Sequence, residues 1–205
     1  MLDLDSYQDE PELVARSRRG DLDAFNRLVE RYQTPLYNLC LRMLGSPQTA
    51  EDATQEAFIN AFRAVHTFKG AAFKAWLFRI AANACYDELR RRKARPARSL
   101  DEPQGAEERQ LDPPQEGPSP EDRAEQQELG RLIQSALLEI PEEQRAAVIL
   151  CDVQGLDYAE VAVAMSVSLG TVKSRIFRGR AHLRAVLVKS GGELLPARLR
   201  QTSEG

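Results

Sequence analysis

The chain has 205 residues, enough for one medium-sized domain or two small ones, and 42% of them are hydrophobic. No apolar run is long enough to span a bilayer, and the acidic start, MLDLDSYQDEPEL, lacks the basic and then apolar pattern of a secretory signal. We therefore expect a cytoplasmic protein without direct membrane insertion. The formal net charge of −3 by itself argues against a nucleic-acid binder, but local fields decide where phosphates bind.

Residues 11–95 have the apolar spacing of helices rather than strands and form the first predicted domain. In the segment after Gly20, apolar residues from Phe25 to Tyr32 recur three and four apart. Pro35 predicts a kink or a break before LYNLCLRML, because proline interrupts a helix. Gly45 predicts the end of this helix. Ser46 and Pro47 predict the cap and first turn of the next helix, over about 47–65.

This third helix has an alanine and phenylalanine side and an opposite polar face. The polar face holds Asp52, Gln55 and Glu56, three and four residues apart. Spacing alone favours an acidic face that is exposed only to solvent. The more specific alternative is that this face binds a protein partner.

A fourth helix, from about Phe73 to Lys93, follows the loop HTFKGAA. Its predicted buried stripe is Phe73, Leu77, Ile80, Ala81 and Ala84, flanked by Trp76. A second stripe holds Arg79, Asn83, Tyr86 and Arg90. Cations and an aromatic on one helical face suit a nucleic-acid strand, because bases stack on the ring while cations hold phosphates. The stripe continues into a cluster from Arg90 to Arg98 that we expect to lack balancing acids.

Residues 96–124 are rich in proline and acids and poor in large apolar residues. Such a stretch buries too little surface to offset its ordering entropy, which predicts a flexible linker. The second predicted domain, 125–188, starts with a helix before Pro141 and continues with EEQRAAVILCDV, which ends at Gln154-Gly155. A tail over 189–205 follows, with no assigned role.

The segment YAEVAVAMSVSLGTVKSRIFRGRAHL has the apolar spacing of two short helices packed at a steep angle. Ser168 is placed to cap the second helix, and no acid occurs between Ala162 and Gly192. These features predict a helix-turn-helix whose second helix enters the DNA major groove. We expect Lys173, Ser174, Phe177 and Arg178 to read base edges. Arg175, Arg180 and Arg184 are candidates for phosphate contacts.

The sequence predicts neither a metal site nor a catalytic site. Cys40, Cys85 and Cys151 are far apart in the chain, without a CxxC pair or a nearby histidine. We expect the three cysteines to be small, buried, hydrophobic side chains of a protein in a reducing compartment. No paired carboxylates, glycine-rich phosphate loop or Ser/His/Asp set is present, so we expect no enzyme and no cofactor.

Two blocks of the chain resemble bacterial sigma factors. AEDATQEAFINAFRAVHTFKG followed by FKAWLFRIAANACYDELRRRK is similar to their region 2. PEEQRAAVILCDVQGLDYAEVAVAMSVSLGTVKSRIFRGRAHLR is similar to their region 4. With only a linker between the two blocks, the chain resembles the extracytoplasmic-function (ECF) group. The resemblance implies an all-α fold of two small helical domains. It also implies a factor that binds core RNA polymerase and directs promoter recognition, DNA opening and transcription initiation.

The resemblance also implies roles for individual residues. Asp52, Gln55 and Glu56 match the family's DxxQE motif, which binds the clamp helices of the largest polymerase subunit. The resemblance also implies a second contact with the polymerase, at its flap. The −10 element would be contacted by Phe68, Lys69, Arg79, Asn83, Tyr86 and Arg90. The −35 element would be contacted by Ser168, Thr171, Lys173, Ser174, Arg175, Phe177 and Arg178. An anti-sigma factor is the further partner that this group implies.

Two departures from the family pattern bear on these roles. The loop FKGAAFKAW is one residue shorter than is common, with Ala71 and Ala72 at positions that are more often polar. Ser166 occupies a turn position where helix-turn-helix motifs often have glycine. The alternative function is a DNA-binding regulator whose first domain senses a ligand or partner and needs no polymerase, and an enzymatic function ranks behind both.

Overall fold

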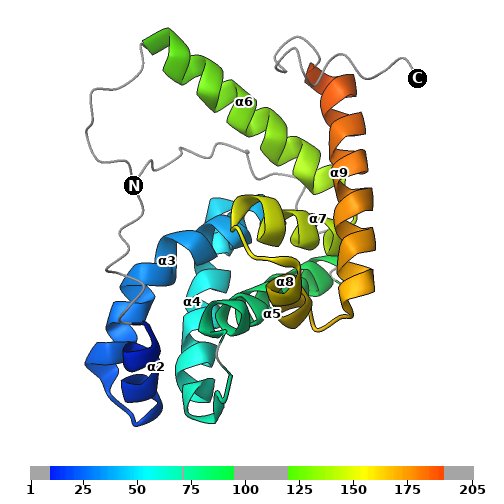
Figure 1. Cartoon of the computed structure of the whole chain (residues 1–205). Helices are drawn as coiled ribbons and strands as arrows, with labels where there is room; N and C mark the ends of the chain where they lie inside the picture. Colours follow the sequence, from blue (N-terminus) through cyan, green and yellow to red (C-terminus); the bar gives the residue numbers. More distant parts are fainter. Residues whose placement is uncertain (1–9, 71, 95–119, 192–205) are drawn as a thin grey trace.

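The computed structural model describes residues 10–70, 72–94 and 120–191, and these ranges contain helices and turns but no strand (Figure 1). The all-α prediction is therefore confirmed. Among the described residues, no helix combines the length and the apolar character that crossing a bilayer would require.

The first domain consists of α2 (Glu10–Arg18), α3 (Leu22–Leu44), α4 (Pro47–Ala64), a 3₁₀ turn η1 (Val65–Thr67) and α5 (Phe73–Ala94). Asp21 caps α3 by accepting a hydrogen bond from the Ala24 N–H at 3.0 Å. Gly45 ends α3 with a φ of 76°, a left-handed conformation that glycine adopts at little cost. Helices α3, α4 and α5 pack against one another around the buried core.

Two local predictions need adjustment. Pro35 lies inside α3, which continues through it without a break in the assigned helix. Leu36 and Leu39 just beyond it are fully buried, and this packing offsets the cost of a proline within the helix. Ser46 occupies the N-cap position of α4, but its side chain makes no capping hydrogen bond.

The second domain consists of α6 (Pro120–Glu139), α7 (Glu142–Val148), a π-helical turn η2 (Ile149–Val153), α8 (Tyr158–Met165) and α9 (Leu169–Gly191). The predicted helix EEQRAAVILCDV is present, but its second half widens into the π turn, a form that sequence periodicity does not distinguish. Helix α6 begins at Pro120, inside the range predicted to be linker. The preceding part of that linker, 96–119, lies outside the described residues.

The turn between α8 and α9 has the geometry of the predicted helix-turn-helix. Ser166 adopts a left-handed conformation, with φ 54° and ψ 43°, which explains why glycine is common at this position. Ser168 caps α9, since its hydroxyl accepts from the Thr171 N–H at 3.2 Å. Asp157 and Glu160 form a reciprocal capping box that fixes the start of α8.

The two domains pack against each other. Buried residues of both belong to one continuous hydrophobic cluster, which runs from Leu13 in α2 to Ile176 in α9. Helix α8 lies against α5, and α6 and α7 contact α3 (Figure 1). A side-chain Cβ at Gly45 would come within 2.6 Å of the Leu138 side chain, so the end of α3 approaches α6 closely.

Candidate protein-docking and nucleic-acid interfaces

Helix α4 presents the predicted acidic face to solvent. Asp52, Gln55 and Glu56 are exposed, while Ala53 and Ala57 are buried on the other side. Within the described part of the chain, Asp52 and Gln55 have no ion-pair or side-chain hydrogen-bond partner. Glu56 lies 3.5 Å from the Arg91 guanidinium. The face is therefore mostly free to receive a cationic or polar partner.

The same face continues into exposed apolar side chains that the sequence analysis missed. Gln55, Ile59 and Phe62 follow at intervals of four and three residues and so share one side of the helix. Ile59 is 51% exposed and Phe62 is 44% exposed. The sequence places Phe62 on the buried side, but its ring lies edge-on to Phe25, with centres 5.1 Å apart, and leaves one side open. Periodicity does not resolve this, because Phe62 lies at the border of the buried stripe.

Helix α5 carries the stripe predicted to hold a DNA strand. Arg79 and Arg90 are exposed, as is Asn83 between them. Tyr86 is only partly exposed, and burial raises the pKa of its phenol to about 12. Its hydroxyl oxygen is buried and has no hydrogen-bond partner in the described part of the chain. Three of the four stripe residues are therefore presented to solvent, and Tyr86 lies under the second domain.

The loop before α5 is organised around buried aromatic rings. Phe68 is 8% exposed and packs against Phe73 and Trp76, with ring centres 5.6 and 5.1 Å away. This burial does not suit the direct DNA contact that the resemblance implies for Phe68, because its ring faces the core. Lys69 is exposed beside it. Ala71, where the loop departs from the family pattern, lies outside the described residues.

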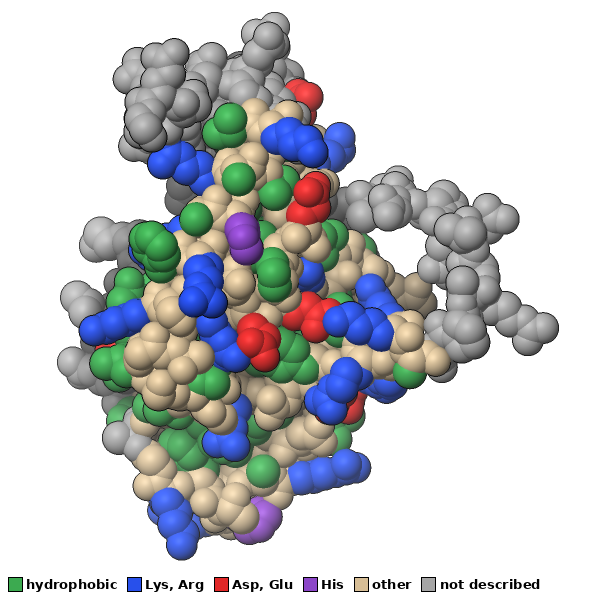
Figure 2. Space-filling model, turned by 90° about the vertical axis from the view of Figure 1, so that its right-hand side faces the viewer, with side chains coloured by type: hydrophobic (Ala, Val, Ile, Leu, Met, Phe, Trp, Pro, Cys, Tyr) green, Lys and Arg blue, Asp and Glu red, His purple; other side chains and the backbone are tan. Residues whose placement is uncertain are grey.

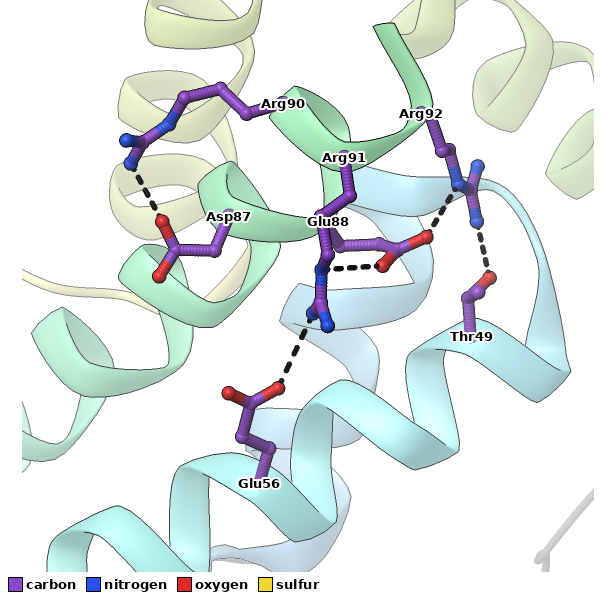
Figure 3. Close-up of polar contacts among 7 residues, drawn as sticks. All are labelled: Thr49, Glu56, Asp87, Glu88, Arg90, Arg91 and Arg92. Carbon is purple, nitrogen blue, oxygen red and sulfur yellow. Dashed lines mark hydrogen bonds and ion pairs between the residues drawn. The ribbon is translucent and has the colours of Figure 1, made fainter. Parts of the chain in front are cut away.

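The cationic end of α5 is balanced by acids, which corrects the expectation of unbalanced cations (Figure 3). Arg90 pairs with Asp87 at 2.7 Å, and Arg92 pairs with Glu88 at 3.0 Å. Arg91 lies between Glu88 and Glu56 of α4. Outside the figure, Lys93 pairs with Glu142 of α7 at 2.8 Å. Arg95 and Arg98 lie outside the described residues. The positive field over α5 is thus weaker than the run of arginines indicates.

Helix α9 presents the predicted recognition face. Lys173 and Arg178 are exposed, and Phe177 is 76% exposed, the largest exposed fraction among the large apolar residues described. An apolar ring in water at the centre of a basic face suits contact with a thymine methyl. Figure 2, viewed from the α9 side of Figure 1, shows Lys and Arg side chains spread among apolar ones. Ser174 is partly buried, and its hydroxyl donates to the Thr171 carbonyl at 2.9 Å.

Two arginines of α9 have acidic partners within the protein. Arg175 is 20% exposed and forms an ion pair with Glu143 of α7. Arg180 pairs with Asp152 through two nitrogens, and this contact raises its pKa. Arg178, by contrast, has no ion-pair partner among the described residues. Spacing along the helix does not separate these arginines, because the acidic partners come from elements outside α9.

The cysteines follow the prediction in part. Cys40 and Cys85 are fully buried, whereas Cys151 is only partly buried. Cys40 and Cys85 adjoin in the core of the first domain, and their mutual hydrogen bond, together with burial, raises the pKa of the Cys85 thiol. No group of three or more histidine, cysteine or acidic side chains suited to a metal occurs among the described residues.

Fold and surfaces together define a helical DNA-binding protein with a separate face suited to protein docking. Residues 28–95 match the family model for sigma-70 region 2, and residues 130–183 match the model for sigma-70 region 4. The chain is 40% identical to the ECF RNA polymerase sigma factor SigE of Mycolicibacterium smegmatis, over 87% of this chain and 67% of that protein. It is 38% identical to the RNA polymerase sigma-H factor of Pseudomonas aeruginosa, over 85% and 92% of the two chains.

The solved structures agree. CnrH in complex with the cytosolic domain of CnrY superposes with a TM-score of 0.66 and 26% identity, over 89% of this chain and 99% of that one. RpoE in complex with the anti-sigma factor NepR, from Bartonella quintana, has the same fold with a TM-score of 0.61 and 24% identity, over 81% and 98% of the two chains.

The chain therefore belongs to the ECF group of RNA polymerase sigma factors. It is a transcription initiation factor that acts in promoter recognition with core RNA polymerase, and it is not an enzyme. This membership confirms the family resemblance of the sequence and displaces the alternative of a regulator that needs no polymerase.

Proposed function

We propose that the chain docks on core polymerase through Asp52, Gln55 and Glu56 of α4. The supporting observation is that this acidic face is exposed and continues into Ile59 and Phe62. Exposed apolar side chains beside a polar patch suit a protein partner, because apolar contact area and excluded water stabilise protein interfaces. The expected partner surface is the pair of clamp helices of the largest subunit, with a second contact between region 4 and the flap.

DNA recognition in this proposal is divided between the two domains. Lys173, Phe177 and Arg178 of α9 read the −35 element in the major groove, with Ser168, Thr171 and Ser174 nearer the start of that helix. Arg79, Asn83 and Tyr86 of α5, with Lys69 and Arg90, hold one strand of the −10 element after opening. Unstacking costs roughly a few kcal/mol per flipped base, which contacts to the protein must offset.

The docking assignment is tested with a double variant, Asp52→Ala with Glu56→Ala, in a binding assay with purified core polymerase. We expect at least a tenfold loss of affinity and a matching loss of promoter-specific run-off transcripts. Glu51→Ala is the control, since Glu51 is an exposed acid on the same helix that does not belong to the proposed docking set. Core binding unchanged by the double variant would show that α4 is not the docking face.

We further propose an anti-sigma factor as a partner and the cytoplasm as the compartment. The first is supported by the matches to RpoE of Bartonella quintana, which was solved with the anti-sigma factor NepR, and to CnrH, which was solved with the cytosolic domain of CnrY. The second is supported by family membership, since initiation takes place where the polymerase and the promoter are.

A further inference from the structure

The end of α4 and the turn that follows it carry basic side chains on one side and apolar side chains on the other. A 3₁₀ turn has three residues per turn, so side chains three apart lie in line around η1. Val65 and Phe68 form the inner line and are 3% and 8% exposed. Arg63, His66 and Lys69 recur at the same interval and are all exposed. We call these three residues the basic strip.

The basic strip has no acids to balance it. Residues 57–86 contain no aspartate or glutamate, and the strip side chains have no ion-pair partner within the described part of the chain. Helix α2 packs against η1 and contributes two acids, Glu10 and Glu12. These acids have cationic neighbours of their own in Arg31 and Arg16. The strip therefore differs from the far end of α5, where acids accompany the arginines.

The basic strip adjoins the surface proposed for the −10 strand. Lys69 belongs to both, and Arg79 and Asn83 continue the exposed polar surface along α5. The end of α4 and η1 project below α5 and away from the helices of the second domain (Figure 1). At this lower end of the molecule, the face in Figure 2 shows basic side chains and no acidic one. Because the second domain is assigned the upstream −35 element, the strip extends the −10 surface in the downstream direction.

The length and chemistry of the strip suit the backbone of a single strand. From Arg63 to Lys69 the chain advances by about 12 Å, at about 2 Å per residue. A strand with a stacked spacing of about 3.4 Å covers this length with about three to four nucleotides. An arginine binds a phosphate through two parallel hydrogen bonds, and an imidazole donates a hydrogen bond or stacks on a base. Basic groups in line, with no acid between them, match phosphates at a regular spacing.

We propose that Arg63 and His66 bind the opened DNA strand just downstream of the −10 element, beyond the nucleotides that α5 holds. The inference rests on the proposed function, which assigns Lys69 and the exposed face of α5 to this strand. The contacts are made to phosphates, so they add affinity and fix the path of the strand without a sequence preference. They lengthen the single-stranded DNA that the first domain holds in the direction of the start site.

Binding of labelled single-stranded oligonucleotides to the polymerase complex tests the proposal. One oligonucleotide ends at the −10 element, and the other continues for about four nucleotides downstream. The wild-type complex should bind the longer one about fivefold more tightly, because it gains phosphate contacts. Arg63→Ala with His66→Ala should abolish this gain and leave binding of the shorter oligonucleotide unchanged. On the longer one, Arg63→Ala alone should lower the slope of log affinity against log salt concentration by about 0.7, the value for one phosphate contact on a single strand.

Two variants and a separate measurement of core binding control the experiment. Arg27→Ala should keep the full gain, since Arg27 is an exposed arginine of the same domain outside the strip. Arg63→Lys keeps the charge and should retain part of the gain. Affinity for core polymerase should be the same for all variants. An equal loss on both oligonucleotides together with weaker core binding would show that Arg63 contacts the polymerase, and this would overturn the proposal.

The wild-type complex also separates the proposal from the proposed function. If it binds the shorter oligonucleotide and gains nothing from the longer one, the strip does not contact DNA, although the −10 assignment stands. A gain that survives the double variant would equally overturn the proposal. If the complex binds neither oligonucleotide, the assignment of α5 to the −10 strand fails and the strip fails with it. Binding of the longer oligonucleotide alone, lost in the double variant, would support the strip and count against the −10 assignment.

Discussion

At the scale of single residues, cations on one helix differ in role because their surroundings differ. Arg175 is paired with Glu143 and mostly buried, whereas Arg178 is exposed on the recognition face. We expect Arg175→Ala to lower the free energy of unfolding by about 1 kcal/mol, through the lost ion pair and side-chain packing. Arg178→Ala should instead weaken −35 binding by about 1–3 kcal/mol and leave stability nearly unchanged.

Thermal unfolding and promoter binding by the polymerase complex, measured on both variants, separate these roles. The prediction is wrong if Arg175→Ala weakens −35 binding as much as Arg178→Ala does, since Arg175 would then contact DNA directly.

Tyr86 allows a prediction on stability and pH. Its buried hydroxyl has no partner in the described structure, so Tyr86→Phe should raise the free energy of unfolding by about 1–3 kcal/mol.

The pKa of the Tyr86 phenol in the folded protein is about 12, which lies above the ordinary value of 10.0. Stability associated with the neutral phenol is therefore complete below pH 10 and is lost as the pH rises from 10 towards 12. Denaturant unfolding across this range should show a shallower decline for Tyr86→Phe than for the wild-type chain.

The residue stripes could be predicted from the sequence, but the ionic partners that come from other helices could not. Spacing alone identified the faces around Asp52, Asn83 and Lys173, because side chains three and four apart share one side of a helix. Glu143, which pairs with Arg175, is 32 residues away in the chain, and Glu56 of α4, which pairs with Arg91, is 35 residues away. Local spacing carries no information about such contacts. The pairs of Arg90 with Asp87 and of Arg92 with Glu88, by contrast, are three and four residues apart, so spacing along α5 does indicate that part of the charge balance.

At the scale of elements, the packing of α7 against α9 depends on Gly179. A Cβ at this position would lie 2.6 Å from the Val148 side chain and 3.0 Å from the Gln144 carbonyl oxygen. We expect Gly179→Ala to destabilise the protein by about 1–3 kcal/mol, because backbone on the facing helix cannot yield easily. A lower midpoint of thermal unfolding, followed by circular dichroism, would show this.

Gly170 provides a matched control on the same helix. It is exposed, and the nearest atom to a Cβ there is the Ser168 hydroxyl oxygen at 3.9 Å. Gly170→Ala should stabilise the chain by about 0.5–1 kcal/mol, because alanine loses less backbone entropy in a helix. Equal effects of the two substitutions would contradict the importance of close approach at Gly179.

Helix boundaries were most predictable where a specific residue sets the geometry. Gly45 and Ser168 mark helix ends in the sequence and in the structure, since each satisfies backbone groups that a helix leaves unpaired. Pro35 misled because tertiary packing outweighs its local cost. The π turn at Ile149–Val153 changes the number of residues per turn without changing composition, so no sequence signal reveals it.

At the scale of the whole molecule, two helical modules were predictable from the sequence, but their mutual packing was not. The apolar residues of each module predict a core for that module alone. The contacts that join the two modules link residues far apart in the sequence. Arg145 and Met43 are 102 residues apart, and Gln134 and Leu41 are 93 apart. Only the folded chain shows that Arg145, which lies in an ordinary helical segment, connects the two domains.

A shared core makes unfolding of the two domains cooperative. Trp76, the only tryptophan in the chain, reports on the first domain, whereas far-ultraviolet circular dichroism reports on all helices. Because buried residues of both domains belong to one core, both signals should follow one urea transition with one midpoint and one slope. Lys74→Ala with Gln134→Ala removes two interdomain hydrogen bonds without touching either DNA face. This variant should separate the two signals into distinct midpoints, because each domain then unfolds more independently. Two transitions already present in the wild-type chain would mean that the domains are not coupled in solution.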